Sequence, residues 1–181
     1  MKSEQQLIEE SKRGDGHSYA QLMEAHQDLV YHLVLQMVPS EAEDLVQEIF
    51  MKAYHNLPKF RGESSFKTWL VRLAINHCKN HQRKMKVRQT ALQSLLWEAR
   101  GATPVSTTSS FDASETVHIQ ASLQKLAYRH REVVVLHDVL GFKYSEIGEM
   151  LNLSLGTVKS RLYYARSALR RHLTEKSSEG M

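Results

Sequence analysis

The chain has 181 residues, of which 41% are hydrophobic, and this allows one mid-sized domain or two small ones. Its formal net charge of +4 fits an anionic partner without requiring one. The single cysteine, Cys78, excludes an intrachain disulfide and favours a reducing compartment. The N-terminus is polar, and no segment approaches the roughly 18 apolar residues of a membrane span. We therefore expect a cytoplasmic protein without a signal peptide.

The predicted secondary structure is almost entirely helical, because long proline-free segments carry apolar residues at a period near 3.6. In the N-terminal part, helices are expected at residues 4–14, 18–38, 40–56 and 65–85. Ser40 is expected to cap the third of these helices, because its hydroxyl can accept a backbone N–H. In the C-terminal part, helices are expected at residues 116–127, 129–139, 144–151 and 155–173.

A polar segment separates the two parts. Residues 103–110 read TPVSTTSS and can bury little apolar surface, so they predict a flexible linker. We assign an N-terminal domain to residues 1–97, the linker to 98–115, a C-terminal domain to 116–175 and a tail to 176–181. The predicted fold class is all-α, with two small helical domains joined by a flexible linker.

Residues 144–173 have the features of a helix-turn-helix. Ile147 and Leu151 give a short helix an apolar face, and Ser154 is a favourable N-cap for the next helix. Apolar residues recur in that second helix at spacings of four, three and four, at Val158, Leu162, Ala165 and Leu169. Its opposite face is polar and basic, with no acidic residue between Glu149 and Glu175. Such a helix fits the major groove of DNA; a solvated helix in a plain bundle is the alternative.

A second basic surface is predicted in the N-terminal domain. Residues 64–97 contain no Asp or Glu but seven Lys or Arg. Polar and basic side chains share one side of the expected helix, at Asn76, Lys79, Asn80 and Arg83. Phe66 and Trp69 follow the loop at residues 61–64, and aromatic rings beside basic residues suit an unstacked base of single-stranded DNA. For the aromatic residues alone, burial in the core is the favoured interpretation.

The helix expected at residues 40–56 has the opposite charge. Its acidic residues are Glu41, Glu43, Asp44 and Glu48, and its apolar stripe is Leu45, Ile49 and Ala53. An acidic helix repels phosphate, so it indicates either a surface that docks on a protein or a solvated face. Without further information, the solvated face is the more common case.

Together these segments resemble bacterial sigma factors of the extracytoplasmic-function group, in the sigma-70 superfamily. Residues 43–53, EDLVQEIFMKA, are similar to the polymerase-docking helix of that family. Residues 60–62, FRG, and 66–70, FKTWL, are similar to its promoter-melting loop and the following helix. The start of its C-terminal domain is similar to residues 126–132, 135–136 and 141–142 of this chain. Its recognition motif is similar to residues 144–147 and 156–162. Several motifs in the expected order are more specific than any one of them.

The resemblance implies a role for each matching residue. The residues that would face the clamp helices of the polymerase's largest subunit are Asp44, Gln47 and Glu48. The residues that would read the non-template strand at the minus-ten element are Arg61, Gly62, Ser64, Asn76, Lys79 and Asn80. Facing the minus-thirty-five element are Thr157, Lys159, Ser160, Arg161, Tyr163 and Tyr164. Tyr164 departs from the family, which tends to have a basic residue at this position.

The function that the resemblance implies is that of a sigma factor, which binds core RNA polymerase and directs promoter-specific initiation, with a role in stress response. It is not expected to be an enzyme, because the polymerase performs the phosphoryl transfer. An anti-sigma factor is the implied regulator, and it can hold the chain at the inner face of the membrane. No cofactor, metal or small-molecule substrate is expected.

Two other functions are compatible with parts of the sequence. A ligand-sensing transcription regulator would share the helix-turn-helix, but the acid-free basic stretch argues against a sensing domain. A metal-dependent enzyme could use His77 and His81, which are four residues apart, with Cys78 beside them. A third and fourth ligand at matching spacing are missing, and ten histidines make chance pairs common.

Overall fold

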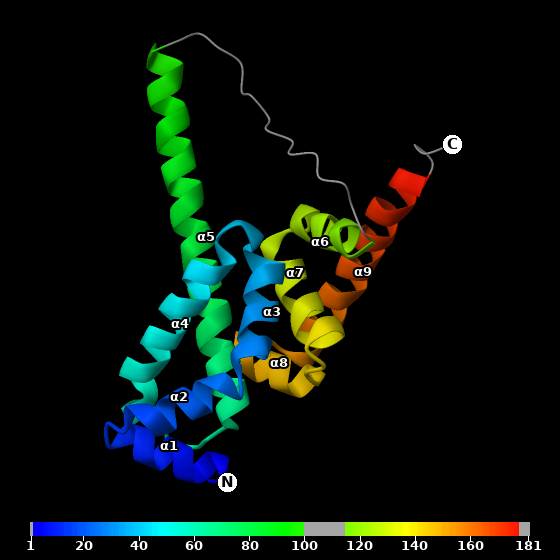
Figure 1. Cartoon of the computed structure of the whole chain (residues 1–181). Coiled ribbons are helices and arrows are strands. Elements are labelled where there is room, and N and C mark those ends of the chain that lie inside the picture. Colours follow the sequence, from blue (N-terminus) through cyan, green and yellow to red (C-terminus); the bar gives the residue numbers. More distant parts are fainter. Residues whose placement is uncertain (1, 100–114, 178–181) are drawn as a thin grey trace.

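The computed structural model describes residues 2–99 and 115–177, and its regular elements are all helices (Figure 1). In the N-terminal half they are α1 (Glu4–Lys12), α2 (Gly16–Glu24), α3 (Gln27–Met37), the 3-10 turn η1 (Pro39–Glu41), α4 (Ala42–Asn56), the 3-10 turn η2 (Leu57–Lys59) and α5 (Phe66–Ala99). In the C-terminal half they are α6 (Glu115–Lys125), α7 (Tyr128–Val134), the π-helical turn η3 (Val135–Val139), α8 (Tyr144–Leu151) and α9 (Leu155–Ser177). The all-α prediction is confirmed. Most of the predicted linker and the end of the tail lie outside the described residues.

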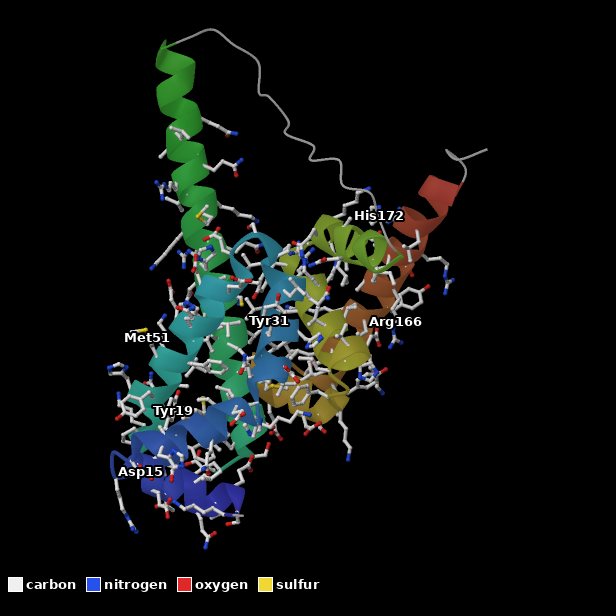
Figure 2. All side chains as sticks on the ribbon, viewed as in Figure 1. Asp15, Tyr19, Tyr31, Met51, Arg166 and His172 are labelled. Atoms are coloured by element: carbon white, nitrogen blue, oxygen red, sulfur yellow. The ribbon has the colours of Figure 1, made fainter. Side chains whose placement is uncertain are left out.

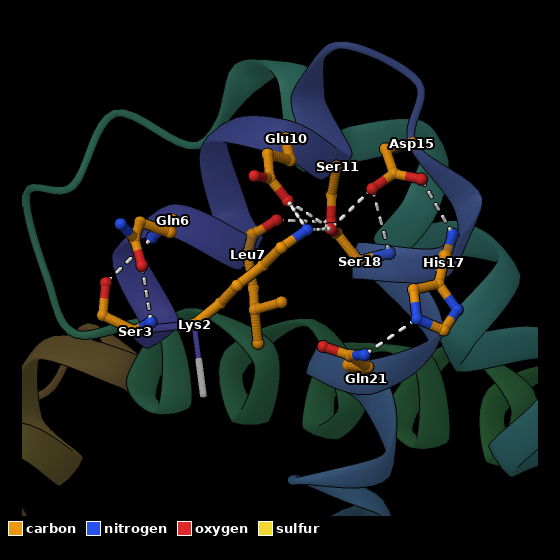
Figure 3. A network of polar contacts seen from close by, with 10 residues as sticks. All are labelled: Lys2, Ser3, Gln6, Leu7, Glu10, Ser11, Asp15, His17, Ser18 and Gln21. Carbon is orange, nitrogen blue, oxygen red and sulfur yellow. Dashed lines mark hydrogen bonds and ion pairs between the residues drawn. The ribbon is translucent and has the colours of Figure 1, made fainter.

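Helices α1 and α2 form a hairpin that polar contacts fix at its start and at its turn (Figure 3). The Ser3 hydroxyl opens α1 as one half of a capping box. The Asp15 carboxylate opens α2 by accepting the backbone N–H of Ser18 at 3.3 Å. The Ser18 hydroxyl and the Lys2 ammonium both reach the Glu10 carboxylate. These contacts join the first helix of the chain to the second.

The prediction of a single helix at residues 18–38 was wrong, because α2 ends at Glu24 and α3 begins at Gln27. The break contains no proline or glycine, so local preference does not explain it. His26 lies at the break, where its Nε2 atom is 2.9 Å from Glu4 Oε1 of α1. Its ring centroid lies 5.2 Å from that of Phe66 in α5. The interruption therefore accompanies contacts with two other helices.

The cap expected at Ser40 was also wrong. Pro39 opens the short 3-10 turn η1, and α4 begins only at Ala42. The residue at the N-cap position, Glu41, makes no side-chain capping bond. Acidic residues in the first turn, Glu43 and Asp44, instead place negative charge near the unpaired N–H groups of this end.

Two other helices depart from their expected lengths. Helix α5 continues well past residue 85 to Ala99, and its second half stands clear of the rest of the molecule (Figure 1). All residues from 83 to 93 are exposed. The helix expected at residues 129–139 is α7 followed by the π-helical turn η3.

The buried apolar residues of both halves belong to one continuous cluster. The predicted apolar stripe of α4 is fully buried, at Leu45, Ile49 and Ala53. Most of the predicted stripe of α9 is buried as well, at Val158, Leu162 and Ala165. Helix α3 packs against α6 and η3, and α5 packs against α8. Arg72 Nη2 of α5 donates to the backbone oxygen of Glu149 in α8 at 2.6 Å. Tyr128 Oη of α7 donates to the backbone oxygen of Ile75 in α5 at 3.0 Å. The C-terminal helices thus rest directly on α3 and α5.

Candidate nucleic-acid interface

Helices α8 and α9 form the helix-turn-helix that the sequence predicted. Helix α8 ends at Leu151, and the next residue, Asn152, caps it in the left-handed backbone conformation with φ 54°. The backbone N–H of Leu153 then donates to the Gly148 oxygen at 2.8 Å, which makes the turn tight. Ser154 Oγ accepts the backbone N–H of Thr157 at 3.2 Å, so the predicted cap on α9 is confirmed. The turn fixes α9 relative to α8.

The outward side of α9 carries four predicted DNA-contacting side chains that the structure leaves exposed. We call this set the recognition face: Lys159, Ser160, Tyr163 and Tyr164. The two tyrosine residues are 69% and 61% exposed and pack edge to face, with ring centroids 5.5 Å apart. Tyrosine rings exposed in this way can contact a partner through both their apolar faces and their hydroxyl groups. Thr157 is half-buried beside them.

Two arginine residues of α9 are held by carboxylates of the C-terminal half. Arg161 Nη1 donates to Glu132 Oε1 at 3.0 Å, and Glu132 is buried. Burial raises the pKa of the Glu132 carboxyl, and the charges of Lys79 and Arg161 oppose this shift. Arg166 Nε donates to Asp138 Oδ2 at 3.0 Å and its side chain lies on the outer surface (Figure 2). Arg161 therefore fixes α9 against α7.

Helices α4 and α5 enclose a groove of about 340 Å³ that we call the α4–α5 groove. Its lining is polar and basic with one large ring, and comprises Lys52, Asn56, Lys59, Trp69, Leu73, Asn76, His77 and Asn80. The two asparagine residues predicted to read single-stranded DNA, Asn76 and Asn80, do lie together here. The amide groups can hydrogen-bond base edges, and the lysine residues can hold phosphate. The sequence analysis did not assign Lys52, Asn56 and Lys59 to this site, although Lys52 and Asn56 are four residues apart and share a face of α4.

The other residues predicted for the minus-ten element lie outside the lining of this groove. Arg61 and Gly62 are exposed and Ser64 is half-buried in the loop before α5, where Gly62 has φ +76°. Lys79 is exposed, and its charge acts on Glu132 of α7. The preferred interpretation of the aromatic residues is confirmed for Phe66, which is buried, whereas Trp69 is half-buried and borders the groove.

The three residues predicted to dock on polymerase all point outward from α4. We call Asp44, Gln47 and Glu48 the docking face, and all three are exposed. Met51, one turn further along, continues the same face as an exposed apolar side chain (Figure 2).

Each of the two histidine residues considered as a metal site faces a carboxylate, and of the two only His77 forms a hydrogen bond with it. His77 Nε2 lies 2.8 Å from Glu48 Oε2, and His81 Nε2 lies 3.1 Å from Glu41 Oε2. Cys78 points into the core, and burial raises the pKa of its thiol to about 12. Within residues 2–99 and 115–177, no three His, Cys, Asp or Glu side chains gather as metal ligands do. Over the same ranges, no helix is both long and apolar enough to span a membrane.

Comparison with known proteins identifies the family. The family models of Sigma-70 region 2 and Sigma-70 region 4 match residues 22–88 and 117–169. The ECF RNA polymerase sigma factor SigW of Bacillus subtilis is 34% identical over 180 residues, covering 93% of this chain and 95% of that protein. The chain is an extracytoplasmic-function RNA polymerase sigma factor. The ECF RNA polymerase sigma-E factor of Escherichia coli is 33% identical over 176 residues, with 92% of each protein covered.

Solved structures share the fold of this sigma factor. RpoE from Bartonella quintana, in complex with the anti-sigma factor NepR, has a TM-score of 0.67 and 24% identity, covering 86% of this chain and 96% of that one. CnrH, in complex with the cytosolic domain of CnrY, has a TM-score of 0.67 and 23% identity, covering 93% and 96%. The predicted resemblance to sigma factors is confirmed. In this family the α4–α5 groove falls in region 2 and the helix-turn-helix in region 4.

Proposed function

We propose that this sigma factor initiates transcription by reading a promoter at two separate surfaces. The recognition face of α9 contacts duplex DNA at the minus-thirty-five element, where a helix in the major groove presents its side chains to base edges. The α4–α5 groove binds the separated non-template strand at the minus-ten element. The single observation that supports this division most strongly is the groove itself, which brings Asn76, Asn80 and two lysine residues beside Trp69.

Strand capture at the groove explains how the protein favours promoter opening. A base can stack on the half-buried Trp69 and bond to Asn76 or Asn80 only after it has left the duplex. Binding that is available only in the melted state shifts the equilibrium between duplex and melted DNA toward melting. In this proposal Arg61, Gly62 and Ser64 form the flexible rim that guides the strand, and Lys79 contributes long-range charge.

The docking face binds the clamp helices of the polymerase. Exposed carboxylates at Asp44 and Glu48 and the amide of Gln47 give a surface that repels DNA but suits a basic protein surface. The polymerase performs the phosphoryl transfer, so this chain contributes binding and orientation and is not itself an enzyme. An anti-sigma factor regulates it, a proposal supported by the similar sigma factor RpoE, which was solved with the anti-sigma factor NepR. Such a partner, if anchored, holds the chain at the inner face of the membrane.

In vitro transcription tests the proposal. Core RNA polymerase is mixed with a pool of promoter fragments, with and without the full chain, and the starts are mapped by sequencing. Specific starts that depend on the chain support the proposal and supply the promoter sequence. Tight binding to duplex without polymerase, and no chain-dependent start, would favour a conventional transcription regulator instead.

A further inference from the structure

His77 lies between the docking face and the α4–α5 groove, and it contacts a residue of each. Its side chain projects from α5 toward α4 and is only 8% exposed. His77 Nε2 lies 2.8 Å from Oε2 of Glu48, a residue of the docking face. His77 Nδ1 lies 2.6 Å from Nζ of Lys52, a residue that lines the groove. One imidazole ring therefore joins the two surfaces.

The hydrogen-bond chemistry fixes the protonation state of this ring. A lysine ammonium group can only donate, so His77 Nδ1 must accept from Lys52 and carry no proton. The proton of the neutral ring then lies on Nε2, which donates it to the Glu48 carboxylate. Both ring nitrogens are satisfied in this arrangement. A neutral imidazole thus bridges a cation and an anion.

The ring also sets where the two charged groups point. Glu48 and Lys52 are four residues apart on α4, a spacing at which opposite charges readily pair with each other. No direct ion pair within 4.0 Å joins these two described residues; each contacts the ring instead. The side chain of Glu48 is 58% exposed and free to meet a partner, while the Lys52 ammonium is held at the groove. The His77 ring therefore connects Glu48 and Lys52 indirectly, in place of a direct ion pair between them.

We propose that His77 is a positioning residue that couples polymerase docking at Glu48 to strand capture at Lys52. This inference rests on the proposed function, because it requires both surfaces to act as described. A basic group of the polymerase that binds Glu48 restricts the carboxylate to one conformation. The carboxylate then orients the ring, and the ring holds the ammonium where DNA phosphate binds. The conformational entropy of these side chains is lost at docking and need not be lost again at strand capture, so the two binding events show positive cooperativity.

The coupling should depend on pH. Burial lowers the pKa of His77, the Glu48 hydrogen bond opposes this shift, and the charges of Lys52 and His81 add to it. Glu41 of η1 is the carboxylate that faces His81. A protonated ring would present an N–H to the Lys52 ammonium and could not accept from it. The coupling is therefore intact at neutral pH and is lost as the pH falls through the lowered pKa, below 6.5.

Affinity for single-stranded DNA measures the coupling. The probe is a fluorescent oligonucleotide with the non-template minus-ten sequence of a promoter identified by in vitro transcription. Its affinity is measured for the free full chain and for the holoenzyme, and the ratio of the two affinities reports the coupling. His77→Leu removes both ring contacts, and we expect the ratio to fall about five- to tenfold. His77→Gln keeps one donor and one acceptor without titrating, and we expect it to retain most of the ratio.

Matched controls separate the possible outcomes. His81→Leu removes a histidine one turn away that does not contact Lys52, and we expect an unchanged ratio. Between about pH 7.5 and 5, the ratio should fall for the wild-type chain and stay level for His77→Gln. Equal ratios for the wild-type chain and a folded His77→Leu variant, or the same pH profile for the wild-type chain and His77→Gln, would overturn the coupling. Wild-type holoenzyme that starts no specific transcript would instead overturn the proposed function.

Discussion

Replacing Arg131 should destabilise the fold strongly, because its buried guanidinium group hydrogen-bonds three backbone carbonyl groups at the ends of two other helices. Arg131 is only 4% exposed in α7. Its Nη1 atom donates to the backbone oxygen of Met37, at the end of α3, at 2.9 Å. Its Nη2 atom donates to those of Gln124 and Leu126, at the end of α6, at 2.7 and 3.2 Å. A cation placed at two helix C-termini also meets the negative ends of both helix dipoles.

The magnitude follows from the groups left without partners. Arg131→Met keeps a similar length but leaves three carbonyl groups without these donors, and hydrogen bonds to a charged group contribute about 1.5–3 kcal/mol each. Removing a buried cation also relieves its desolvation, so we expect a net loss of about 3 kcal/mol. For a chain of this size, that loss lowers the Tm by about 6–12 °C. Arg131→Lys keeps the charge but not the forked geometry, so it should recover only part of the loss.

Thermal and urea unfolding followed by circular dichroism measures the effect. Arg129→Met is the matched control, because Arg129 is exposed on the same helix and should change the free energy of unfolding by less than about 0.5 kcal/mol. Equal stability of the Arg131→Met and Arg129→Met variants would mean that the three carbonyl groups do not depend on the guanidinium, and would contradict this role of Arg131.

Three further predictions concern other sites. Iodoacetamide should label Cys78 more than about a hundredfold more slowly in the folded chain than in urea, because burial suppresses the thiolate; comparable rates by mass spectrometry would contradict its burial. Gly148→Ala should cost about 1–3 kcal/mol in urea unfolding, because an added Cβ would lie 2.9 Å from the Leu153 oxygen. A Cβ added at Gly156 would meet Ser154 Oγ at an ordinary contact distance of 3.9 Å, so Gly156→Ala should not destabilise. Lys159→Ala should lower the salt slope of promoter binding by about one unit, as loss of one phosphate contact does; an unchanged slope would exclude that contact.

The helix-turn-helix was predictable because its signals are local. The predicted bounds of α8, residues 144–151, agree with the structure. The Ser154 cap and the apolar stripe that includes Val158 and Leu162 each depend on residues within two turns of one helix. Such short-range preferences are readable from sequence even without knowledge of the packing.

Contacts between distant helices were not predictable in the same way. The α4–α5 groove combines Lys52 and Asn56 with Asn76 and Asn80, and only the packing of α4 on α5 brings these side chains together. The position of His77 between two charged residues of α4 has the same origin.

The helix break and the Arg161 ion pair also depend on tertiary structure. The interruption between α2 and α3 accompanies contacts of His26 with α1 and α5 and has no local signal in the sequence. Arg161 belongs to the predicted recognition motif, but its partner, Glu132, lies 29 positions earlier in the chain. A sequence pattern shows that a cation occupies a helix face, but not that a buried carboxylate lies opposite.

Footprinting of one identified promoter tests the division between the two surfaces most directly. Holoenzymes with the wild-type chain, Asn80→Ala and Lys159→Ala are compared by nuclease protection at the minus-thirty-five element and by permanganate reactivity of thymines at the minus-ten element. We expect the Asn80→Ala holoenzyme to lose permanganate reactivity while upstream protection persists. We also expect Lys159→Ala to weaken the upstream protection. Loss of both signals in the Asn80→Ala holoenzyme, with the variant folded and bound to polymerase, would contradict separate reading of duplex and single-stranded DNA.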